Sequence, residues 1–572
     1  MLPLLSINNL SIKFSHHANT AAAANISNLT IQKGKTVALV GESGSGKSVT
    51  ALSILGLLPK TSKVAGEILF SADSINQLNL ATLSNPEINR LRGKEISMIF
   101  QEPMTSLNPV LTCGTQVIEM LVQHLKLSKR SAREKTTELF KLVELPDPAS
   151  MVDRYPHQLS GGQKQRVMIA MALSCNPRLL IADEPTTALD VRVQQSILIL
   201  LKKIQIQTGL AILLITHDLG IVADVADEIS VMYRGSIVEQ GSAFEVLNNP
   251  QHPYTRALLS CRPAAQNKGK RLAVLTDFLP ENAQQQQVVN FNEVYDNVPL
   301  QEVTNSNPVL SVNRLTVTYP AERNFFGKVT NNFKAVDEVS FDVYKSETIG
   351  IVGESGCGKS TLAKTILQLI KPAAGNILLN GKDISKLSPS ALRSERKNLQ
   401  VVFQDPYGSL NPRLTIGEAI VEAMKVHDLN GNKNGREDKA ISLLQQVQLL
   451  PEHFNRYPHQ FSGGQRQRIC IARALALQPD FMLFDESVSA LDVSAQAQVL
   501  NLINQLKSTY QFTALFISHD LAVVNYISDR ILVMQKGKIV EAGTANQVYR
   551  HPKNEYTQQL IAAIPGKKLS FN

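Results

Sequence analysis

The chain has 572 residues, of which 43% are hydrophobic, and it carries a formal net charge of +9. This length predicts more than one domain. The modest positive charge is more typical of a solvated surface than of attraction to acidic partners such as phosphates or a lipid surface, and we expect no nucleic-acid partner. The longest apolar runs are of strand length, far short of the ~18 residues that suggest a membrane span, and we expect no secretory signal. Five scattered cysteines without a C-x-x-C pair argue against a disulfide framework or a zinc site. These features fit a reducing cytosol, and any membrane role must come through a partner chain.

The first predicted element is a strand at 5–14, where apolar and polar residues alternate. A second strand, 36–40, leads into Gly41-Glu-Ser-Gly-Ser-Gly-Lys-Ser48, after which the pattern becomes helical. Strand, G-x-x-x-x-G-K-S and helix in this order indicate a phosphate-binding P-loop. Nearly the same strand returns at 310–319, followed by a second loop, Gly353-Glu-Ser-Gly-Cys-Gly-Lys-Ser360. Two such loops in register are not explained by a chance glycine-rich turn.

Each P-loop has the residues that bind a nucleotide triphosphate. Its glycines let successive backbone N–H groups turn inward around phosphate oxygens, and the following helix adds its own N-terminal donors. Lys47 and Lys359 are expected to reach the terminal phosphates, and the hydroxyls of Ser48 and Ser360 to bind Mg²⁺. The residues expected to contact the nucleotide from the two loops are Gly41, Gly44, Gly46, Lys47, Ser48, Val49, Gly353, Gly356, Gly358, Lys359, Ser360 and Thr361.

A helical insertion follows each P-loop. From Gln101 to about Gln158 the pattern turns helical, with 115–127 and 132–145 as the expected helices. The same pattern holds from Gln404 to about Gln460. We therefore expect a helical subdomain inserted into each of two α/β cores, whose strands otherwise alternate with helices around a mostly parallel sheet.

A second phosphate cradle lies at the end of each insertion. Ser-Gly-Gly-Gln stands directly before a helical segment in both halves, and a serine with two glycines at a helix start makes an anion site. Because the P-loop already holds the phosphates of one nucleotide, this cradle needs another nucleotide. We expect the two halves to pair antiparallel, each supplying its cradle to the other's nucleotide. The residues of the two cradles are Ser160, Gly161, Gly162, Gln163, Ser462, Gly463, Gly464 and Gln465.

An acidic pair ends an apolar run in each half. Asp183 and Asp485 are predicted at the carboxyl end of a strand, where open α/β sheets bind ligands, and are expected to hold Mg²⁺. Glu184 and Glu486 follow at once and are expected to orient an attacking water or take its proton. A lone Asp-Glu pair is more typical of a solvated turn, but the preceding strand and the paired P-loops favour catalysis.

The repeated motifs divide the chain into 1–262, a linker at 263–308 and 309–572. A repeat of this length is a duplicated domain and not a solenoid. The linker is rich in Gln and Asn, has little apolar periodicity, and is predicted to be a flexible surface segment. Each half also closes alike, with Tyr254-Thr in the first and Tyr556-Thr in the second.

With these motifs the chain resembles the ATPase subunit of an ATP-binding cassette (ABC) transporter in which both cassettes are fused. The resemblance covers nearly everything outside the linker. It implies two tandem nucleotide-binding domains, each with a parallel-sheet P-loop core, a helical subdomain and a small antiparallel β subdomain. It also implies ATP and Mg²⁺ as ligands, two transmembrane permease partners with an extracellular or periplasmic solute-binding protein, and a peripheral position on the cytoplasmic face of the inner membrane.

The remaining family motifs are present. Gln101 and Gln404 match the glutamine that also contacts Mg²⁺, and the Ala-Leu-Asp strings ending at Asp190 and Asp492 match the D-loop. By the same resemblance, the γ-phosphate-sensing histidines are His217 and His519, and the aromatic residues that stack on adenine are Phe14 and Tyr319.

Three local strings resemble the ATPases of peptide, glutathione and nickel importers, including fused versions of the microcin C type: Gln101–Pro109, Arg154–His157 and His252–Thr255. Some relatives carry a C-terminal cysteine cluster that holds an iron–sulfur centre. Only Cys261 lies in that region here, so no iron–sulfur cluster is expected. Ser487 replaces the proline of the first half, without an expected loss of function.

The alternative is a soluble twin-cassette ATPase that acts on ribosomes. That class has a long, charged, helical arm between its cassettes, which the Gln/Asn-rich linker does not match. A regulatory cassette without ATPase activity is opposed by Glu184 and Glu486. One further expectation concerns Cys357, which lies beside Lys359 at a helix start, a position that favours a reactive thiolate where solvent can reach the thiol; the alternative is a small residue tolerated in the loop.

Overall fold

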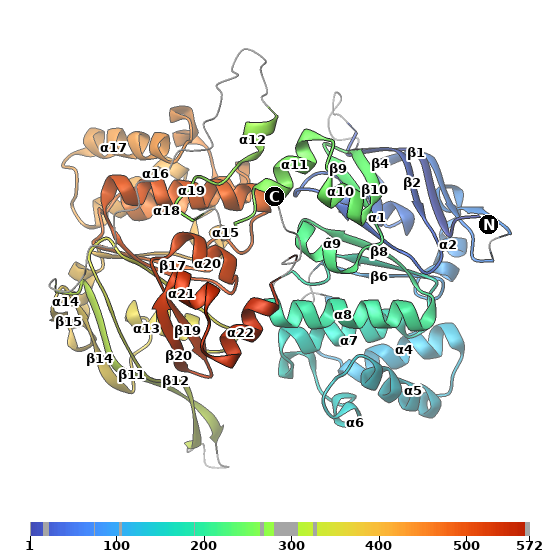
Figure 1. The fold of residues 1–572 in the computed structure, drawn as a ribbon, viewed down its shortest axis with the longest axis horizontal. Helices are drawn as coiled ribbons and strands as arrows, with labels where there is room; N and C mark the ends of the chain where they lie inside the picture. The colour runs from blue at the N-terminus through green and yellow to red at the C-terminus, as the bar shows by residue number, and fades with distance from the viewer. Residues whose placement is uncertain are drawn as a thin grey trace. The chain divides into compact units, whose positions relative to one another are not determined.

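The computed structural model describes residues 2–14, 22–73, 75–101, 106–187, 189–263, 268–279, 307–323, 329–564 and Gly566. The chain divides into two compact units (Figure 1). The first contains the chain up to Leu259 together with Gly566, and the second runs from Ser260 to Ile564.

A six-stranded sheet forms the centre of the first unit. Its order is β10 (Ser236–Ser242), β9 (Glu228–Tyr233), β3 (Thr36–Val40), β8 (Ala211–Thr216), β7 (Leu179–Asp183) and β6 (Ile96–Ile99). All neighbours pair in parallel except β10, which is antiparallel to β9. Strands β3, β7 and β8 are buried along their whole length, which explains why they read as continuous apolar runs.

A smaller antiparallel sheet packs against this centre. Its order is β2 (Ala24–Ile31), β1 (Leu5–Phe14), β4 (Ser62–Phe70) and β5 (Leu78–Asn79). The inward residues of β1, such as Leu5 and Ile7, share one core with Val37 and Leu39 of β3. The alternation that predicted β1 therefore comes from one buried face.

The helices of the first unit include the predicted insertion. Its main helices, α4 and α5, lie close to the expected ranges and pack with α7 into one core that continues under the sheet. The helices are α1 (Lys47–Ile54), α2 (Asn85–Leu91), α4 (Cys113–Leu125), α5 (Lys129–Leu142), α6 (Pro148–Met151), α7 (Gly161–Leu173), α8 (Val191–Thr208), α9 (Leu219–Val225), α10 (Ala243–Asn248) and α11 (Pro253–Ser260), with 3₁₀ turns η1 (Leu80–Thr82) and η2 (Pro156–Gln158).

The second unit repeats this architecture. Its six-stranded sheet has the order β16 (Leu399–Val402), β17 (Phe481–Asp485), β18 (Thr513–Ile517), β13 (Thr348–Val352), β19 (Arg530–Gln535) and β20 (Lys538–Thr544), and its antiparallel sheet the order β12 (Val329–Val343), β11 (Leu310–Arg323), β14 (Ala374–Leu379) and β15 (Lys382–Asp383). The predicted α/β class, with a helical insertion and a small antiparallel sheet in each half, is confirmed.

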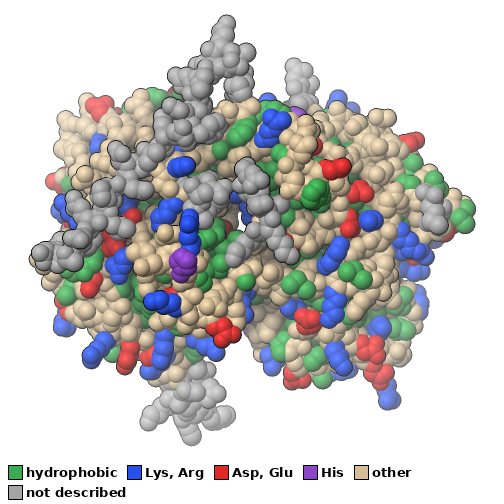
Figure 2. All heavy atoms as spheres, in the orientation of Figure 1, with side chains coloured by type: hydrophobic (Ala, Val, Ile, Leu, Met, Phe, Trp, Pro, Cys, Tyr) green, Lys and Arg blue, Asp and Glu red, His purple; other side chains and the backbone are tan. Residues whose placement is uncertain are grey.

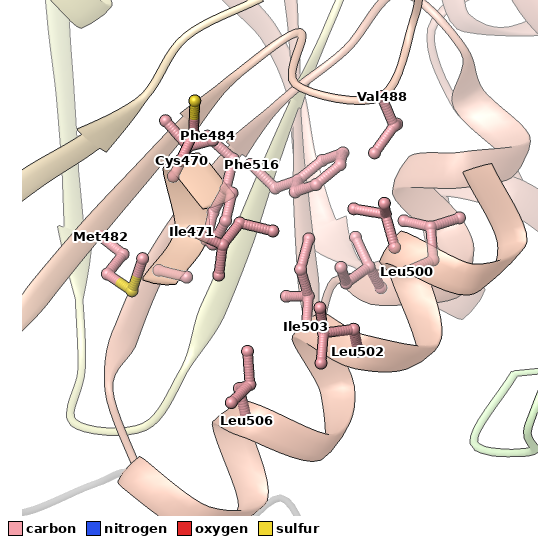
Figure 3. Packing of buried hydrophobic residues seen from close by; sticks show 14 of the residues in the cluster. Cys470, Ile471, Met482, Phe484, Val488, Leu500, Leu502, Ile503, Leu506 and Phe516 are labelled. Atoms are coloured by element: carbon pink, nitrogen blue, oxygen red, sulfur yellow. The ribbon is translucent and has the colours of Figure 1, made fainter. Parts of the chain in front are cut away.

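Helices of the second unit cover its sheet in the same way. Figure 3 shows part of the core, where Phe484 and Phe516 of the sheet face Cys470 of α18 and the leucines of α19. The helices are α13 (Lys359–Ile366), α14 (Pro389–Glu395), α15 (Pro406–Ser409), α16 (Ile416–Val426), α17 (Lys433–Gln446), α18 (Gly463–Leu475), α19 (Val493–Tyr510), α20 (Leu521–Ile527), α21 (Ala545–Arg550) and α22 (Glu555–Ala562), with 3₁₀ turns η4 (Ile384–Lys386), η5 (Pro451–Asn455) and η6 (Pro458–Gln460).

Part of the segment expected to be a flexible surface linker differs from that expectation. Residues 268–279, which include α12 (Leu275–Phe278), belong to the second unit. Leu272 is fully buried in its core beside the residues of α19 and α20. Here the run Leu272-Ala-Val274 supplies buried apolar side chains, while residues 280–306 lie outside the described residues.

The surface and the helices agree with the bulk composition. On the face drawn in Figure 2, Lys and Arg side chains are scattered among Asp and Glu instead of gathering in one area. Among the described helices, none is both long enough and apolar enough to span a bilayer.

Candidate functional site

The two P-loops take up the predicted strand–loop–helix geometry. In the first, β3 runs into Gly41 and α1 begins at Lys47. A side chain at Gly41 would place its Cβ 2.2 Å from the Met232 carbonyl oxygen, so only glycine fits there. Gly44 and Gly46 have φ of 80° and 103°, a region that favours glycine. The loop of the second unit has the same features at Gly353, Gly356 and Gly358.

The P-loop lysines are buried and held by their own loops. Lys47 Nζ donates to the carbonyl oxygens of Gly41 and Glu42 at 2.8 and 2.7 Å. Lys359 Nζ makes the corresponding bonds to Gly353 and Glu354 at 2.7 and 2.9 Å. Each amine therefore lies beside the backbone N–H groups of its P-loop. There, a phosphate oxygen can replace a loop carbonyl as the acceptor of the lysine hydrogen bond.

A tyrosine that the sequence did not assign supports each loop. The backbone N–H of Glu42 donates to the hydroxyl oxygen of Tyr254 at 2.9 Å, and that of Glu354 donates to Tyr556 at 3.0 Å. Both tyrosines are buried and come from helices at the end of their cassette, α11 and α22. The repeated Tyr-Thr at the end of each half was the only signal for this role.

The Asp carboxylates lie where a Mg²⁺ ion would need them. Asp183 ends β7 and is buried, and the hydroxyl of Ser48 donates to its Oδ1 at 3.2 Å. Burial raises the pKa of Asp183 and of Asp485, because each loses hydration. Asp485 Oδ1 is buried and has no recorded hydrogen-bond partner in the described chain. A carboxylate with one buried oxygen left without a partner, beside a serine hydroxyl, fits a hard cation.

No all-protein metal cage accompanies these residues. The described part of the chain has no group of three or more His, Cys, Asp or Glu side chains that could hold a metal. Mg²⁺ is usually bound by one or two carboxylates together with substrate phosphates and water. The pair of one Asp and one Ser at each P-loop therefore suits Mg²⁺ that arrives with a nucleotide.

The two candidate catalytic glutamates share an unusual backbone conformation. Glu184 and Glu486 each have a φ of 47°, in the left-handed region that costs energy for a residue with a side chain. Their N–H groups still continue the sheet by donating to Ile215 and Ile517 at 2.9 Å. The backbone thus turns directly after the buried Asp and directs the next carboxylate away from the strand.

In the first unit three side chains hold the Glu184 carboxylate. Gln101 Nε2 and Thr187 Oγ1 both donate to Oε2 at 2.9 Å, and His217 Nδ1 lies 3.1 Å from Oε1. Burial disfavours the Glu184 charge, but the bonds to His217 and Thr187 outweigh it and lower the pKa of Glu184 to about 2. Burial likewise opposes the charge of His217, yet the carboxylate raises the pKa of that imidazole. The structure therefore brings Gln101, Glu184 and His217 together.

The second unit has the same pair with fewer partners. His519 Nδ1 lies 3.5 Å from Glu486 Oε2, and Ser489 takes the place of Thr187. The Ser489 hydroxyl donates to the Glu486 backbone carbonyl at 2.8 Å instead of to its carboxylate. No bond from Gln404 to Glu486 is recorded in the described chain. The pKa of Glu486 is still lowered, because His519 outweighs the effect of burial.

The Ser-Gly-Gly-Gln motifs form capped helix starts. Ser160 precedes α7: its Oγ accepts from the Gln163 N–H at 3.3 Å, and its own N–H donates to Gln163 Oε1 at 3.0 Å. Ser462 and Gln465 make the same reciprocal pair at the start of α18. Such a box fixes the first turn while the N–H groups of the two glycines remain available for an anion.

The other predicted residues occupy separate positions. Phe14 is the last residue of β1, and Tyr319 lies in β11 with its ring partly exposed. Asp190 and Asp492 cap α8 and α19 by accepting from Val193 and Ala495 N–H groups at 3.0 and 2.8 Å. Ala188 of the first D-loop string lies outside the described residues.

The expectation of a reactive Cys357 is wrong. The thiol is buried under the P-loop, and burial raises its pKa even though Lys359 acts in the opposite direction. Lys359 Nζ lies 3.9 Å from the sulfur. The sequence shows the neighbouring lysine and helix start but not the loss of hydration, which dominates.

Comparisons with known proteins give similar sequences along nearly the whole chain. The family described as ABC transporter matches residues 24–187 and 336–489, and the family described as oligopeptide/dipeptide transporter, C-terminal region, matches 238–291 and 540–568. The glutathione import ATP-binding protein GsiA of Pectobacterium atrosepticum is 45% identical over 572 residues, which cover 99% of this chain and 90% of that protein. GsiA of Escherichia coli strain K12 is 44% identical over 569 residues, with 98% and 89% covered. Among solved structures, the dimeric ABC transporter cassette MJ0796 is 26% identical and covers 41% of this chain and 98% of its own, with a TM-score of 0.37.

Proposed function

Since the chain belongs to the ABC transporter family, we propose that it uses ATP hydrolysis on its two cassettes to drive import of a peptide-like solute, such as glutathione, through separate membrane permeases. The cassettes extend over 1–262 and 309–572. The chain works at the cytoplasmic face of the inner membrane with two permease subunits and a solute-binding protein. The match to the oligopeptide/dipeptide transporter C-terminal region in both halves supports this class of solute.

One observation carries the hydrolytic part of this proposal. The first unit gathers Gln101, Glu184 and His217 within hydrogen-bond distance beside a P-loop whose Ser48 contacts Asp183. This arrangement provides a loop that binds phosphates, a site for a cation and a carboxylate that can act on water. These are the groups that phosphoryl transfer to water requires. Ser48, Asp183 and Gln101 would hold a Mg²⁺ ion in the first unit, and Ser360, Asp485 and Gln404 would hold one in the second. When bound, the ion would supply positive charge that offsets the negative charge of the phosphates.

The Glu184–His217 pair gives the carboxylate two states. With His217 as its partner, Glu184 has a strongly lowered pKa and is a weak base that orients water by accepting a hydrogen bond. When His217 turns to the γ-phosphate, Glu184 loses the partner that lowers its pKa and becomes a stronger base. The exchange links arrival of the γ-phosphate to activation of the water. Glu486 and His519 act in the same way.

Each ATP is enclosed by one P-loop and the other cassette's Ser-Gly-Gly motif. Lys47 works with Ser462, and Lys359 with Ser160, while Phe14 and Tyr319 stack on the two adenines. The capped starts of α7 and α18 support this pairing, because each offers backbone donors to an anion that its own P-loop does not supply. No observation favours the ribosome-associated alternative, and the import proteins that match nearly the whole chain argue against it.

The test uses the full-length protein with Glu184→Gln, Glu486→Gln and the double variant. The double variant should bind ATP as the wild type does, while its rate of phosphate release falls by about 10²–10⁴-fold, the usual contribution of a general base. Ser462→Arg should reduce hydrolysis at the site of Lys47 without unfolding the second cassette. A double glutamine variant that hydrolyses ATP at the wild-type rate would refute the assignment. Failure of the chain to co-purify with co-expressed permeases would refute its role in import.

A further inference from the structure

A short segment of the chain without helical structure packs on α19 and α20 of the second unit. We call residues 268–274 the strap. Asn501 of α19 recognises its backbone twice: the Leu272 N–H donates to Asn501 Oδ1 at 2.9 Å, and Asn501 Nδ2 donates to the Leu272 carbonyl at 2.8 Å. The hydroxyl of Tyr526 donates to the Lys270 carbonyl at 2.9 Å. Leu272, Ala273 and Val274 are all buried. The strap is therefore packed against the second unit through both its backbone and its side chains.

A similar amino-acid sequence occurs at the end of the chain. The strap contains Gly269-Lys-Arg-Leu-Ala-Val274, and the chain ends with Gly566-Lys-Lys-Leu-Ser-Phe-Asn572. We call 566–572 the tail. Both begin with a left-handed glycine, with φ of 76° at Gly269 and 70° at Gly566. Both follow the last helix of a cassette, and both start within the stretches matched by one family description. Residues 567–572 lie outside the described part of the chain.

The first unit has an open helix face at the position that binds the strap in the second. Helix α8 corresponds to α19, and Ile199 stands where α19 has Asn501. Asn501 is only 8% exposed under the strap, whereas Ile199 is 61% exposed and Ile206, two turns along the same face, is 72% exposed. Two isoleucines this open on one face of a helix indicate an interaction surface.

We propose that the tail binds the Ile199–Ile206 face of α8 as the strap binds α19. The division of the chain supports this occupant. The strap follows the first cassette but belongs to the second unit, and Gly566 follows the second cassette but belongs to the first unit. The side chains on the two surfaces differ, but the differences compensate for each other. Ile199 cannot make the two hydrogen bonds that Asn501 makes, while Phe571 of the tail has more apolar surface to bury than Val274 of the strap.

Cysteine labelling in the full-length protein tests the proposal directly. The five native cysteines are buried, so a maleimide reports on an introduced one. Ile199→Cys should react about tenfold slower in the full chain than in a chain that stops after Pro565, the factor that corresponds to 1.4 kcal/mol of protection. Leu569→Asp in the full chain should restore the fast rate without shortening the protein. Val110→Cys, an exposed position outside α8, should react equally in all three backgrounds.

A cross-link identifies the occupant. Under mild oxidation, Ile199→Cys with Phe571→Cys should form an intramolecular disulfide, visible as a mobility shift, whereas Val110→Cys with Phe571→Cys should not. Equal labelling of Ile199→Cys with and without the tail would overturn the proposal. Protection that persists in the shortened chain and grows with protein concentration would also overturn it, because the face would then belong to a second copy of the chain.

Discussion

Releasing the strap from the second unit should be measurable as proteolysis at one place. Leu272 is fully buried among the side chains of α19 and α20. Leu→Ala at such a position costs about 2–5 kcal/mol, from lost burial and the cavity that remains. If that loss lowers the free energy needed to release the strap locally, the fraction of molecules with a released strap should rise by a factor of about 30 to several thousand. Asn501→Ala should act on the same equilibrium, because it leaves the N–H and carbonyl of Leu272 without partners, at a cost of about 1–3 kcal/mol each.

Trypsin provides the assay, because Lys268, Lys270 and Arg271 lie inside the strap. Cleavage after these residues tracks the open population when opening and closing are faster than cutting. Mass spectrometry of the full-length protein should show faster cleavage there in Leu272→Ala and Asn501→Ala. Ile199→Ala, at the corresponding exposed position of α8, is the matched control and should leave the rate unchanged. Wild-type cleavage rates in both strap variants would show that these contacts do not hold the segment.

Two further predictions concern the nucleotide sites. Tyr254→Phe removes the acceptor for the Glu42 N–H and should weaken ATP binding at the first P-loop by about tenfold, measured by titration calorimetry, with hydrolysis at saturating ATP little changed. The second uses the pair of Glu184, whose pKa is lowered, and His217, whose pKa is raised. The carboxylate part of its stabilisation is present above the ordinary glutamate pKa of ~4.3 and lost as the pH falls toward 2; the imidazolium part is complete below ~6.5 and lost as the pH rises through the raised pKa. His217→Gln should therefore lower the thermal midpoint most at pH ~5–6, and a difference that grows from there up to pH 9 would contradict the charged pair.

Local chemistry made most of the geometry of the candidate sites predictable from sequence. A P-loop, a capped Ser-Gly-Gly-Gln and an Asp-Glu after a strand each use neighbouring residues, so the pattern contains the geometry. Tyr254 was not predictable in its role, because it supports a backbone N–H that lies 212 residues away. The strap was missed for the same reason: three apolar residues in a polar stretch give no periodicity, and their partner Asn501 lies 229 residues from Leu272. At Cys357 the sequence showed the charge nearby but not the burial that overrides it.

The two cassettes share the same motifs, yet the structure does not make their candidate catalytic carboxylates equivalent. Glu184 has Gln101, Thr187 and His217 as partners, whereas for Glu486 the described chain records His519 alone. A hydrogen bond to a charged group contributes about 1.5–3 kcal/mol. Breaking the hydrogen bonds of Glu184 therefore costs more free energy than breaking those of Glu486, and an incoming ligand must supply the difference. Duplicated sites that differ in this way respond differently to the same ligand, because the cost of rearrangement is part of the binding free energy. One part of the difference comes from the third residue after the glutamate, which is threonine in the first cassette and serine in the second, a position outside the phosphate-binding motifs.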